Sequence, residues 1–439
     1  MPAEAEGSLP TTASGTALRG SQAVTTLRWV YPARGLVTVL ADSLVVLGRA
    51  PTSTTQLDTE RVSRKHAELK PDSNGHVVRD LDSKNGTFVN GEKIEETSLR
   101  PGDVLRLGDC VAVVETVGLD DLAGFRDLGH GILGGSAMAP VVERVRRAAT
   151  SGSDLFLLGE TGTGKELLAR AYHRYGSREG AFVVFDCTSG AESTRSGDLF
   201  GRSERALPPG EHPSVGHVRA ADRGTLLLDG LLDLSVDLQT KLAKTMEKHE
   251  VTPLGEARPI AVDVRFVATS SVASEERPPE RYNALLKKHF GGLTVRVPPL
   301  RQRRADIVPL FLNLLERHGR GAPPKLEPEL VEQLCLHDWP MNIRELDSVA
   351  RRLVERADEG ELRLEHFADA VSLRAVRTGR AAPTPPPASR RAGTPYPSAE
   401  LAALRAALER HGGNLTKAAN ELEITRSKAY RMLKLAEDD

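Results

Sequence analysis

Seven residues near the middle of the chain have the types and spacing of a phosphate-binding loop. They match G-x-x-x-x-G-K, in which glycines let backbone N–H groups turn toward phosphate oxygens and the lysine neutralises the terminal phosphates. The apolar run 155–158 before them is typical of a buried strand, and 166–171 after them of a helix, which is the context that such a loop requires. The pattern therefore predicts nucleotide binding. The loop residues are Gly159, Glu160, Thr161, Gly162, Thr163, Gly164 and Lys165.

The strand expected to complete a hydrolytic site is 225–229, which ends on Asp229 and is followed by Gly230. Hydrolysis needs a carboxylate that orients or deprotonates the attacking water, a role that contributes a factor of about 10² to 10⁴ in rate. Gly230 stands where that carboxylate is expected and has no side chain. Nucleotide binding is thus predicted, and hydrolysis stays open.

A second group of candidate residues lies in the first quarter of the chain. Short alternating or apolar runs between 27 and 117, with Asn-Gly and Pro-Gly turns between them, predict an all-β sandwich. Loops of a sandwich cluster at one end. We expect that cluster to hold Arg49, Ser63, Arg64 and Asn85. Guanidinium forks with a hydroxyl and an amide suit a phosphate of about −1.5 to −2 charge.

At these residues the region resembles a forkhead-associated (FHA) domain, a module that binds phosphothreonine. The family pattern of G-R, S-x-x-H and N-G spans nearly all of residues 40–92. The resemblance implies that the two arginines and the serine of the cluster hold the phosphate, that Asn85 holds the peptide backbone, and that His66 braces the loop. It also implies a phosphothreonine-containing partner from a Ser/Thr kinase pathway. Asn90-Gly91, in contrast, is expected to be an ordinary hairpin turn.

The region from Ile132 to about Leu364 resembles the AAA+ domain of bacterial sigma-54-dependent transcription activators. In the phosphate-binding loop, Glu166 follows the lysine as it does in that family. The resemblance implies that Lys165 holds phosphates, that Asp229 organises Mg²⁺ and its water, and that Arg344 senses the nucleotide from a helical lid. It implies ATP and Mg²⁺ as cofactors. The other matching motifs are 198–201, 224–229, 298–301 and 339–346.

Several positions depart from the AAA+ pattern where the family places its chemistry. The family glutamate is replaced by Gly230, and the two family arginines that act on a neighbouring subunit fall on Asn283 and His289. Such arginines contribute a factor of roughly 10³ to 10⁵ in rate. The neighbouring lysines 287 and 288 lack the rigid planar fork of arginine. Two further departures, where the family has Asn, are Asp186 and Ser270.

The loop through which the family contacts sigma-54 also differs. The family reads Gly-Ala-Phe-Thr-Gly-Ala shortly after Leu-Phe-Gly, whereas residues 205–210 read Arg-Ala-Leu-Pro-Pro-Gly. The aromatic residue and the first glycine are missing, and two prolines stiffen the tip. We therefore do not expect ordinary engagement of the sigma-54 RNA polymerase.

The last segment, 398–439, predicts a small helical domain in which Thr425 caps a basic helix. It resembles the Fis-type helix-turn-helix of sigma-54 activators at 412–414 and 429–434. A solvated helical hairpin is the alternative. We expect duplex DNA as the partner, bound by a homo-oligomer because one recognition helix buries little surface. The candidate DNA-binding residues are Arg426, Ser427, Lys428, Arg431 and Lys434.

Composition limits the remaining choices. The chain has 439 residues with 59 basic and 60 acidic side chains, so no global field recruits nucleic acid. Three scattered cysteines, with no metal-ligand spacing, indicate core positions in a reduced protein. We find no membrane-spanning run or leader, and expect a cytoplasmic bacterial protein. The predicted parts are a disordered tail 1–26, the FHA domain 27–117, an α/β AAA+ subdomain 131–300, a helical lid 301–373, a Pro/Arg-rich linker 374–397 and the helix-turn-helix 398–439.

Two functions of different class stay open. In one, the protein is a regulator or scaffold that responds to phosphorylated partners and binds ATP without hydrolysing it well. In the other, it is a working ATPase that remodels sigma-54 polymerase. The losses at Gly230, Asn283 and His289 favour the first.

Overall fold

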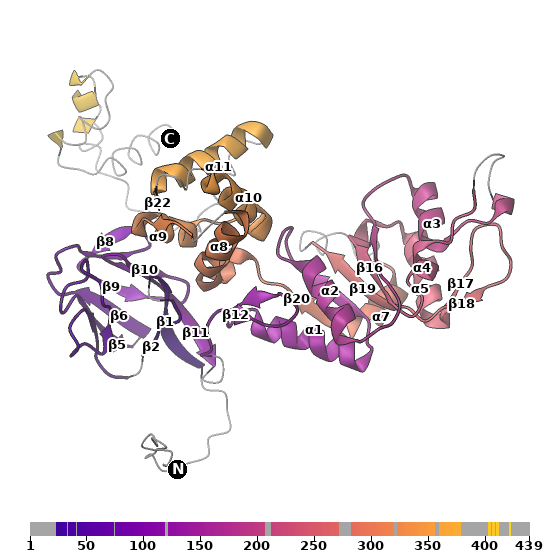
Figure 1. Cartoon of the computed structure of the whole chain (residues 1–439), viewed down its shortest axis with the longest axis horizontal. Coiled ribbons are helices and arrows are strands. Elements are labelled where there is room, and N and C mark those ends of the chain that lie inside the picture. The colour runs from indigo at the N-terminus through magenta and orange to yellow at the C-terminus, as the bar shows by residue number, and fades with distance from the viewer. Residues whose placement is uncertain are drawn as a thin grey trace, which may run out of the picture. The chain divides into compact units, whose positions relative to one another are not determined.

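The computed structural model separates into two compact units, Met1–Leu373 and Arg374–Asp439, which we describe one at a time (Figure 1). Within the described parts of the chain, no helix has both the length and the apolar character needed to cross a bilayer. The residues that the structure describes are 23–32, 34–40, 42–73, 75–118, 122–206, 212–271, 282–319, 323–355, 360–378, 403–404, 406–408, 410–411 and 421–422.

The first part of unit Met1–Leu373 is the predicted all-β sandwich, although its first strand begins at Ala23, inside the segment 1–26 that we predicted to be a disordered tail. Its strands are β1 (Ala23–Tyr31), β2 (Val37–Leu40), β3 (Val45–Gly48), β4 (Thr55–Gln56), β5 (Ala67–Asp72), β6 (Gly75–Asp80), β7 (Thr87–Val89), β8 (Glu92–Ile94), β9 (Glu96–Leu99), β10 (Val104–Leu107) and β11 (Cys110–Gly118). One sheet has the order β2-β1-β11-β10-β7-β8 and the other β4-β3-β5-β6-β9. Because side chains alternate along a strand, Leu105 and Leu107 of β10 face the sandwich core while Val104 points the other way.

Local signals in the sandwich are confirmed. The turn between β7 and β8 has φ of 51° at Asn90 and 81° at Gly91, the left-handed values of a two-residue hairpin turn.

The three cysteines, Cys110, Cys187 and Cys335, are all free and buried, which confirms the expected core positions.

The α/β part is built on a parallel sheet of order β15-β16-β19-β14-β20. Helices α1 and α2 cover one face, where they meet Leu155 and Leu157, and α3, α4, α5 and α7 cover the other, where they meet Phe156 and Leu158 (Figure 1). The strands are β14 (Leu155–Leu158), β15 (Phe182–Asp186), β16 (Thr225–Asp229), β19 (Arg265–Ser270) and β20 (Thr294–Arg296). The helices are α1 (Ala139–Ser151), α2 (Lys165–Tyr175), α3 (Glu192–Phe200), α4 (His217–Ala220), α5 (Val236–Lys248) and α7 (Ala284–Gly291).

Helices form the lid, as predicted, around the fully buried Trp339. Its helices are α8 (Arg304–His318), α9 (Pro328–Leu336), α10 (Asn342–Val354) and α11 (Leu364–Thr378). Among the described residues, three two-stranded sheets complete the unit: β12 (Arg126–Asp127) with β13 (Leu133–Gly134), β17 (Glu250–Val251) with β18 (Ile260–Ala261), and β21 (Lys325–Leu326) with β22 (Glu361–Leu362). Helix α11 runs on to Thr378, into the segment that we predicted to be a linker from residue 374.

The outer face of the FHA sheet is covered by the lid, which the sequence did not lead us to expect. Val104, Val111 and Val113 belong to the same apolar cluster as α8 and α9. The Arg106 guanidinium lies 3.9 Å from the centre of the Phe88 ring and donates from Nε to Glu332 Oε2 of α9 at 2.8 Å. This contact joins two domains that the sequence presents as separate.

In unit Arg374–Asp439, Leu404 and Ala407 are buried. The five candidate DNA-binding residues and most of the predicted helix-turn-helix lie outside the described residues, as does the segment 379–400.

Candidate nucleotide and phosphopeptide sites

The phosphate-binding loop lies between β14 and α2, as the sequence predicts. Gly162 and Gly164 have φ of 78° and 102°, a left-handed range that favours glycine. Gly164 begins α2 without a side-chain cap, so first-turn N–H groups of the helix are available to an anion. The backbone of the loop therefore fits a nucleotide phosphate.

The side chain of Lys165 bonds to the backbone of the phosphate-binding loop. Its Nζ donates to the carbonyl oxygens of Gly159 at 2.7 Å and Glu160 at 2.9 Å. Burial lowers the pKa of Lys165 from its ordinary value, nearby Arg344 acts in the same direction, and the carboxylate of Asp229 opposes the shift. Three residues that the resemblance assigned to the nucleotide thus share one electrostatic site.

The lid contacts the loop through residues that sequence reasoning missed. Arg301 donates to both carboxylate oxygens of Glu160, at 2.8 and 2.5 Å. Asn342 Nδ2 donates to the same carboxylate at 3.2 Å and to the carbonyl of Thr161 at 3.0 Å. Arg344, next but one along α10, is exposed, and its Cβ lies 3.1 Å from where a Cβ on Gly162 would stand. The lid thus rests directly on the phosphate-binding loop.

Asp229 is the residue that could hold a magnesium ion. Its carboxylate is exposed at the carboxyl end of β16, and Oδ1 accepts a hydrogen bond from Thr269 Oγ1 at 2.5 Å. Among the described residues, no group of three His, Cys, Asp or Glu side chains could cage a metal. One carboxylate together with phosphates and water is the usual way in which proteins hold Mg²⁺, so the site fits Mg²⁺ bound with ATP. Glu166, which the resemblance also assigned to the nucleotide site, forms an exposed ion pair with Arg170.

Gly230 has a conformation that disfavours any side chain. Its φ is 80° and its ψ is 40°. A Cβ there would come within 2.8 Å of Thr188 Cγ2 and 3.1 Å of Asp233 Oδ2. The backbone conformation of residue 230 therefore disfavours a glutamate at this position. The carboxylate of Asp233 lies beside the place that such a side chain would occupy.

One of the two positions where the family has arginine has a structural role here. Asn283 caps α7, because its Oδ1 accepts hydrogen bonds from the backbone of Leu285 at 2.9 Å and Leu286 at 3.3 Å. Its Nδ2 donates to Thr240 Oγ1 at 2.7 Å. His289 lies in the last turn of α7. An Asn directly before a helical run is a capping signal that the sequence did contain.

Two other departures can be located in part. Asp186 faces Asp229 in the register of the adjacent strands, and its carboxylate accepts hydrogen bonds from Thr188 and Ser189. In the altered sigma-54 loop, Arg205 and Ala206 end a short 3₁₀ turn, and residues 207–211 lie outside the described residues.

The predicted phosphopeptide residues come together. Arg49, Ser63, Arg64 and Asn85 line one hollow of about 710 Å³ at the loop end of the FHA domain. His66 is fully buried; its Nδ1 accepts from the Ser63 backbone at 3.1 Å and its Nε2 bonds to the Gly86 carbonyl at 3.2 Å. Burial lowers the pKa of His66, which favours the neutral ring that this pattern requires. His66 thus braces the loop, as the resemblance implied.

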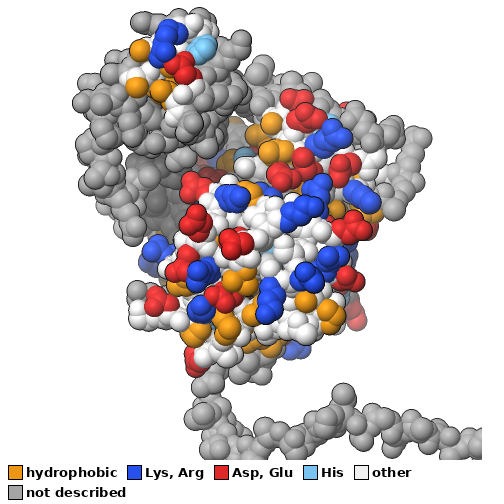
Figure 2. All heavy atoms as spheres, turned by 90° about the vertical axis from the view of Figure 1, so that its left-hand side faces the viewer, with side chains coloured by type: hydrophobic (Ala, Val, Ile, Leu, Met, Phe, Trp, Pro, Cys, Tyr) orange, Lys and Arg blue, Asp and Glu red, His pale blue; other side chains and the backbone are white. Residues whose placement is uncertain are grey.

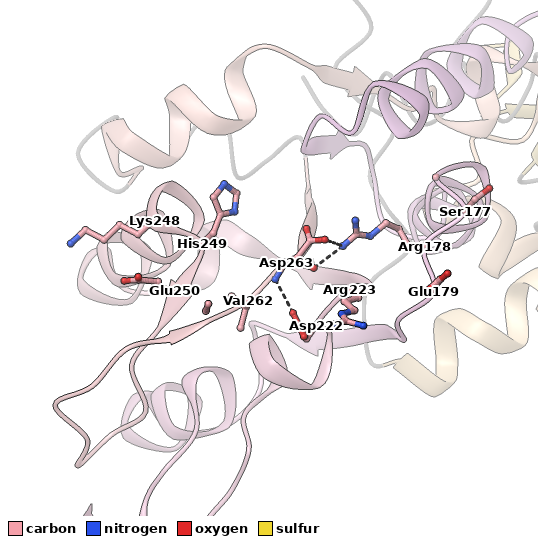
Figure 3. Close-up of a pocket in the computed structure, with 12 residues that line it drawn as sticks. Ser177, Arg178, Glu179, Asp222, Arg223, Lys248, His249, Glu250, Val262 and Asp263 are labelled. Atoms are coloured by element: carbon pink, nitrogen blue, oxygen red, sulfur yellow. Dashed lines mark hydrogen bonds and ion pairs between the residues drawn. The ribbon is translucent and has the colours of Figure 1, made fainter.

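A larger hollow of about 860 Å³ lies in the α/β part, at the end of the parallel sheet opposite to the phosphate-binding loop (Figure 3). Arg178 pairs with Asp263 at 2.8 Å, and the Asp263 backbone donates to Asp222 at 2.8 Å. Asp222 and Asp263 precede β16 and β19, so this hollow is at the amino ends of the strands. Ligands of open parallel sheets bind at the carboxyl ends, where the phosphate-binding loop lies. We therefore do not assign the nucleotide to the larger hollow.

Comparison with known proteins supports this architecture. Family models match an FHA domain at 45–108, a sigma-54 interaction domain at 132–282, an AAA+ ATPase lid domain at 301–383 and a bacterial regulatory protein domain of the Fis family at 397–434. The transcriptional regulatory protein ZraR of Klebsiella oxytoca is 34% identical over 307 residues, which cover 67% of this chain and 67% of ZraR. The chain belongs to the sigma-54-dependent, Fis-family transcriptional regulators.

Two other proteins are similar to this chain over comparable spans. The regulatory protein LuxO of Vibrio cholerae is 30% identical over 313 residues, covering 69% of each chain. A crystal structure of NtrX from Brucella abortus in complex with ATP has a TM-score of 0.48 at 25% identity, covering 70% of each chain. The predicted fold class, an FHA sandwich, an AAA+ domain with a helical lid and a Fis-type helix-turn-helix, is confirmed.

Proposed function

We propose that this sigma-54-type regulator binds DNA, captures phosphothreonine partners, binds ATP with Mg²⁺ and hydrolyses ATP slowly. The observation that carries slow hydrolysis is the backbone of Gly230, which is left-handed and crowded by Thr188 and Asp233. No side chain reaches from that position to the attacking water, and a variant cannot restore one without strain.

Binding does not depend on the missing groups. Lys165, the loop backbone and Arg344 would contact the phosphates of ATP, and Asp229 would hold a magnesium ion that neutralises part of their charge. Interactions of this kind lower the free energy of the bound substrate and of the transition state alike, so they support affinity without turnover.

The contribution of a neighbouring subunit is also reduced. Asn283 is committed to capping α7, and Lys287 and Lys288 are exposed on the same helix without a planar guanidinium. A homo-oligomer can therefore assemble around ATP while supplying little transition-state stabilisation.

The deciding experiment measures ATP binding and ATP turnover on one purified sample, with Lys165→Ala as the control for contaminants. An ordinary enzyme turns over about 10 times per second, and losing one factor of roughly 10³ leaves less than one event per minute. We expect ATP binding with turnover at or below that level. Turnover within seconds that Lys165→Ala abolishes would overturn the proposal.

One observation favours the second candidate, a working ATPase that remodels sigma-54 polymerase. Asp233 Oδ2 lies 3.1 Å from where the Cβ of residue 230 would be. If ATP turnover is fast, Asp233→Asn should abolish turnover while leaving ATP affinity unchanged. That result would show that Asp233 supplies the carboxylate that the family has at position 230.

A further inference from the structure

The hollow at the loop end of the FHA domain contains more positive charge than one phosphate needs. Its lining includes five basic side chains and one acidic side chain, Glu60. All five basic side chains are exposed. They are Arg49, Arg61, Arg64, Lys65 and Lys84.

No acidic side chain among the described residues neutralises these basic side chains. Within the described part of the chain, none of the five forms an ion pair, although cations elsewhere in the same domain do: Lys70 pairs with Glu68 at 2.5 Å and Arg79 with Glu96 at 3.8 Å. On the face drawn in Figure 2, Lys and Arg side chains are interspersed with Asp and Glu. The excess at the hollow is therefore a local feature, in a chain whose formal net charge is −1.

The backbone holds the outer cations in a fixed relation to the predicted phosphate contacts. Asn85 Nδ2 donates to the carbonyl of Arg61 at 2.6 Å, and the Lys84 backbone donates to Ser63 Oγ at 3.1 Å. The loops that carry Arg61 and Lys84 are thus bonded to the residues expected to hold the phosphate and the peptide. Lys65 follows Arg64 directly along the chain.

The phosphate accounts for only part of this charge. A phosphothreonine carries about −1.5 to −2 charges, which Arg49 and Arg64 with the Ser63 hydroxyl are sufficient to meet. Arg61, Lys65 and Lys84 then remain around the rim without a partner from the ligand or, among the described residues, from the protein. A ligand with further negative charges beside the phosphate would supply those partners.

A peptide fits this hollow better than a nucleic acid does. Asn85 uses its Nδ2 within the protein, and no described hydrogen bond uses its Oδ1. That oxygen can accept from a backbone N–H, which peptides have and sugar-phosphate backbones lack. The extra negative charges would then belong to Asp and Glu side chains of the same peptide.

We propose that this hollow selects phosphothreonine segments flanked by Asp or Glu, with Arg61, Lys65 and Lys84 as the residues that read the flanking charges. The proposal rests on the proposed phosphothreonine binding of the FHA domain. Exposed charge pairs each contribute about 1.5- to 5-fold in affinity and are screened by salt. Two or three such pairs give an acidic peptide an advantage of about tenfold at low salt.

The test titrates the full-length protein with three fluorescent phosphothreonine peptides whose flanks are acidic, alanine or lysine, and with the acidic peptide lacking phosphate. We expect the affinity order acidic, alanine, lysine, with the preference falling as salt rises. The triple variant Arg61→Gln, Lys65→Gln, Lys84→Gln should bind the alanine-flanked phosphopeptide as the wild type does but lose the acidic preference. A matched control, Lys70→Gln with Arg79→Gln, changes paired cations of the same domain and should keep it.

The outcomes separate the inference from the function on which it rests. Equal wild-type affinity for the three phosphopeptides overturns the charge selection and leaves phosphothreonine binding intact. No binding of any phosphopeptide overturns both. Comparable binding of the unphosphorylated acidic peptide would identify a general anion surface and overturn the selection of phosphothreonine segments.

Discussion

Arg301 and Glu160 form a two-pronged ion pair, with Nη1 to Oε2 at 2.8 Å and Nη2 to Oε1 at 2.5 Å, between residues 141 positions apart. Glu160 belongs to the phosphate-binding loop, and Arg301 lies where the sheet leads into the lid. Asn342 from α10 donates to the same carboxylate. One carboxylate of the phosphate-binding loop therefore binds two residues of the lid region.

This pair should make stability depend on pH at the acid end. Hydrogen bonding from Arg301 holds the pKa of Glu160 below its usual range. A carboxyl whose pKa is lowered by folding stabilises the protein above its unfolded pKa, about 4.3, and that stabilisation is lost as pH falls through the folded pKa. Thermal melts between pH 7 and pH 3 should show the difference between wild type and Glu160→Gln shrinking as the pH drops. Glu166→Gln, in an exposed pair, is the control; equal pH profiles for wild type and Glu160→Gln would contradict the assignment.

The FHA–lid contact should be a strong determinant of stability. Side chains of Arg106 and Glu332 are only 8% and 6% exposed, and Glu332 Oε1 also accepts from the Gly91 backbone at 2.9 Å. Without Glu332 the buried Arg106 keeps only the partly exposed Glu329 as a partner, so Glu332→Ala should destabilise this unit by about 3 kcal/mol in calorimetry. Glu329→Ala, at a partner that is 41% exposed, should cost far less. Similar small effects from both variants would show that the contact is loose.

Substitution of Gly230 separates backbone strain from crowding. Gly230→Ala should destabilise by about 1 to 3 kcal/mol, because φ is positive and the methyl group would press on Thr188. Gly190 has a φ of 81° and nothing within 4 Å of its Cβ position, so Gly190→Ala measures the conformational part alone. The Gly230 variant should melt lower than the Gly190 variant. For the same reason Gly230→Glu alone should restore little ATP turnover.

Among the residues of the FHA hollow, Arg49 should contribute most to phosphopeptide affinity. Arg49→Ala removes a charged contact to the phosphate and should weaken binding of a phosphothreonine peptide by about 1.5 to 3 kcal/mol in calorimetric titration. Arg79→Ala, at an exposed cation of β6 that pairs with Glu96, is the control and should bind normally. Unchanged affinity in the Arg49 variant would move the phosphate elsewhere in the hollow.

DNA binding is expected from the Fis-type domain, whose candidate residues are outside the described part of the chain. Arg431→Ala should weaken specific binding by about 1 to 3 kcal/mol, whereas Lys434→Ala should weaken binding of all DNA about equally. Anisotropy titrations at several salt concentrations, on specific and random duplexes, distinguish the two. If neither substitution changes these curves, another helix contacts the DNA.

Features that depend on neighbours in sequence were predictable. The loop from Gly159 to Lys165 needs only a strand before it, a helix after it and glycines at left-handed positions, and all three are local. The Asn90-Gly91 turn likewise follows from the φ values that those two residues tolerate. The convergence of Arg49, Ser63 and Asn85 was predictable because loops of a sandwich meet at one end.

What the residues by themselves determined is the order of domains, the phosphate-binding loop and the absence of a carboxylate side chain at Gly230. Tertiary structure alone decided that Arg301 reaches Glu160, that Arg106 of the FHA sheet meets Glu332 of the lid across 226 residues, and that Asp233 lies beside the empty position at Gly230. Long charged side chains satisfy local patterning equally well when solvated, so their partners depend on which surfaces the folded chain brings together. The apolar outer face of β10 and β11 packs against α8 and α9 through Val104, Val111 and Val113. This packing buries the Arg106 side chain beside the carboxylates of Glu329 and Glu332, and a buried charge needs such partners.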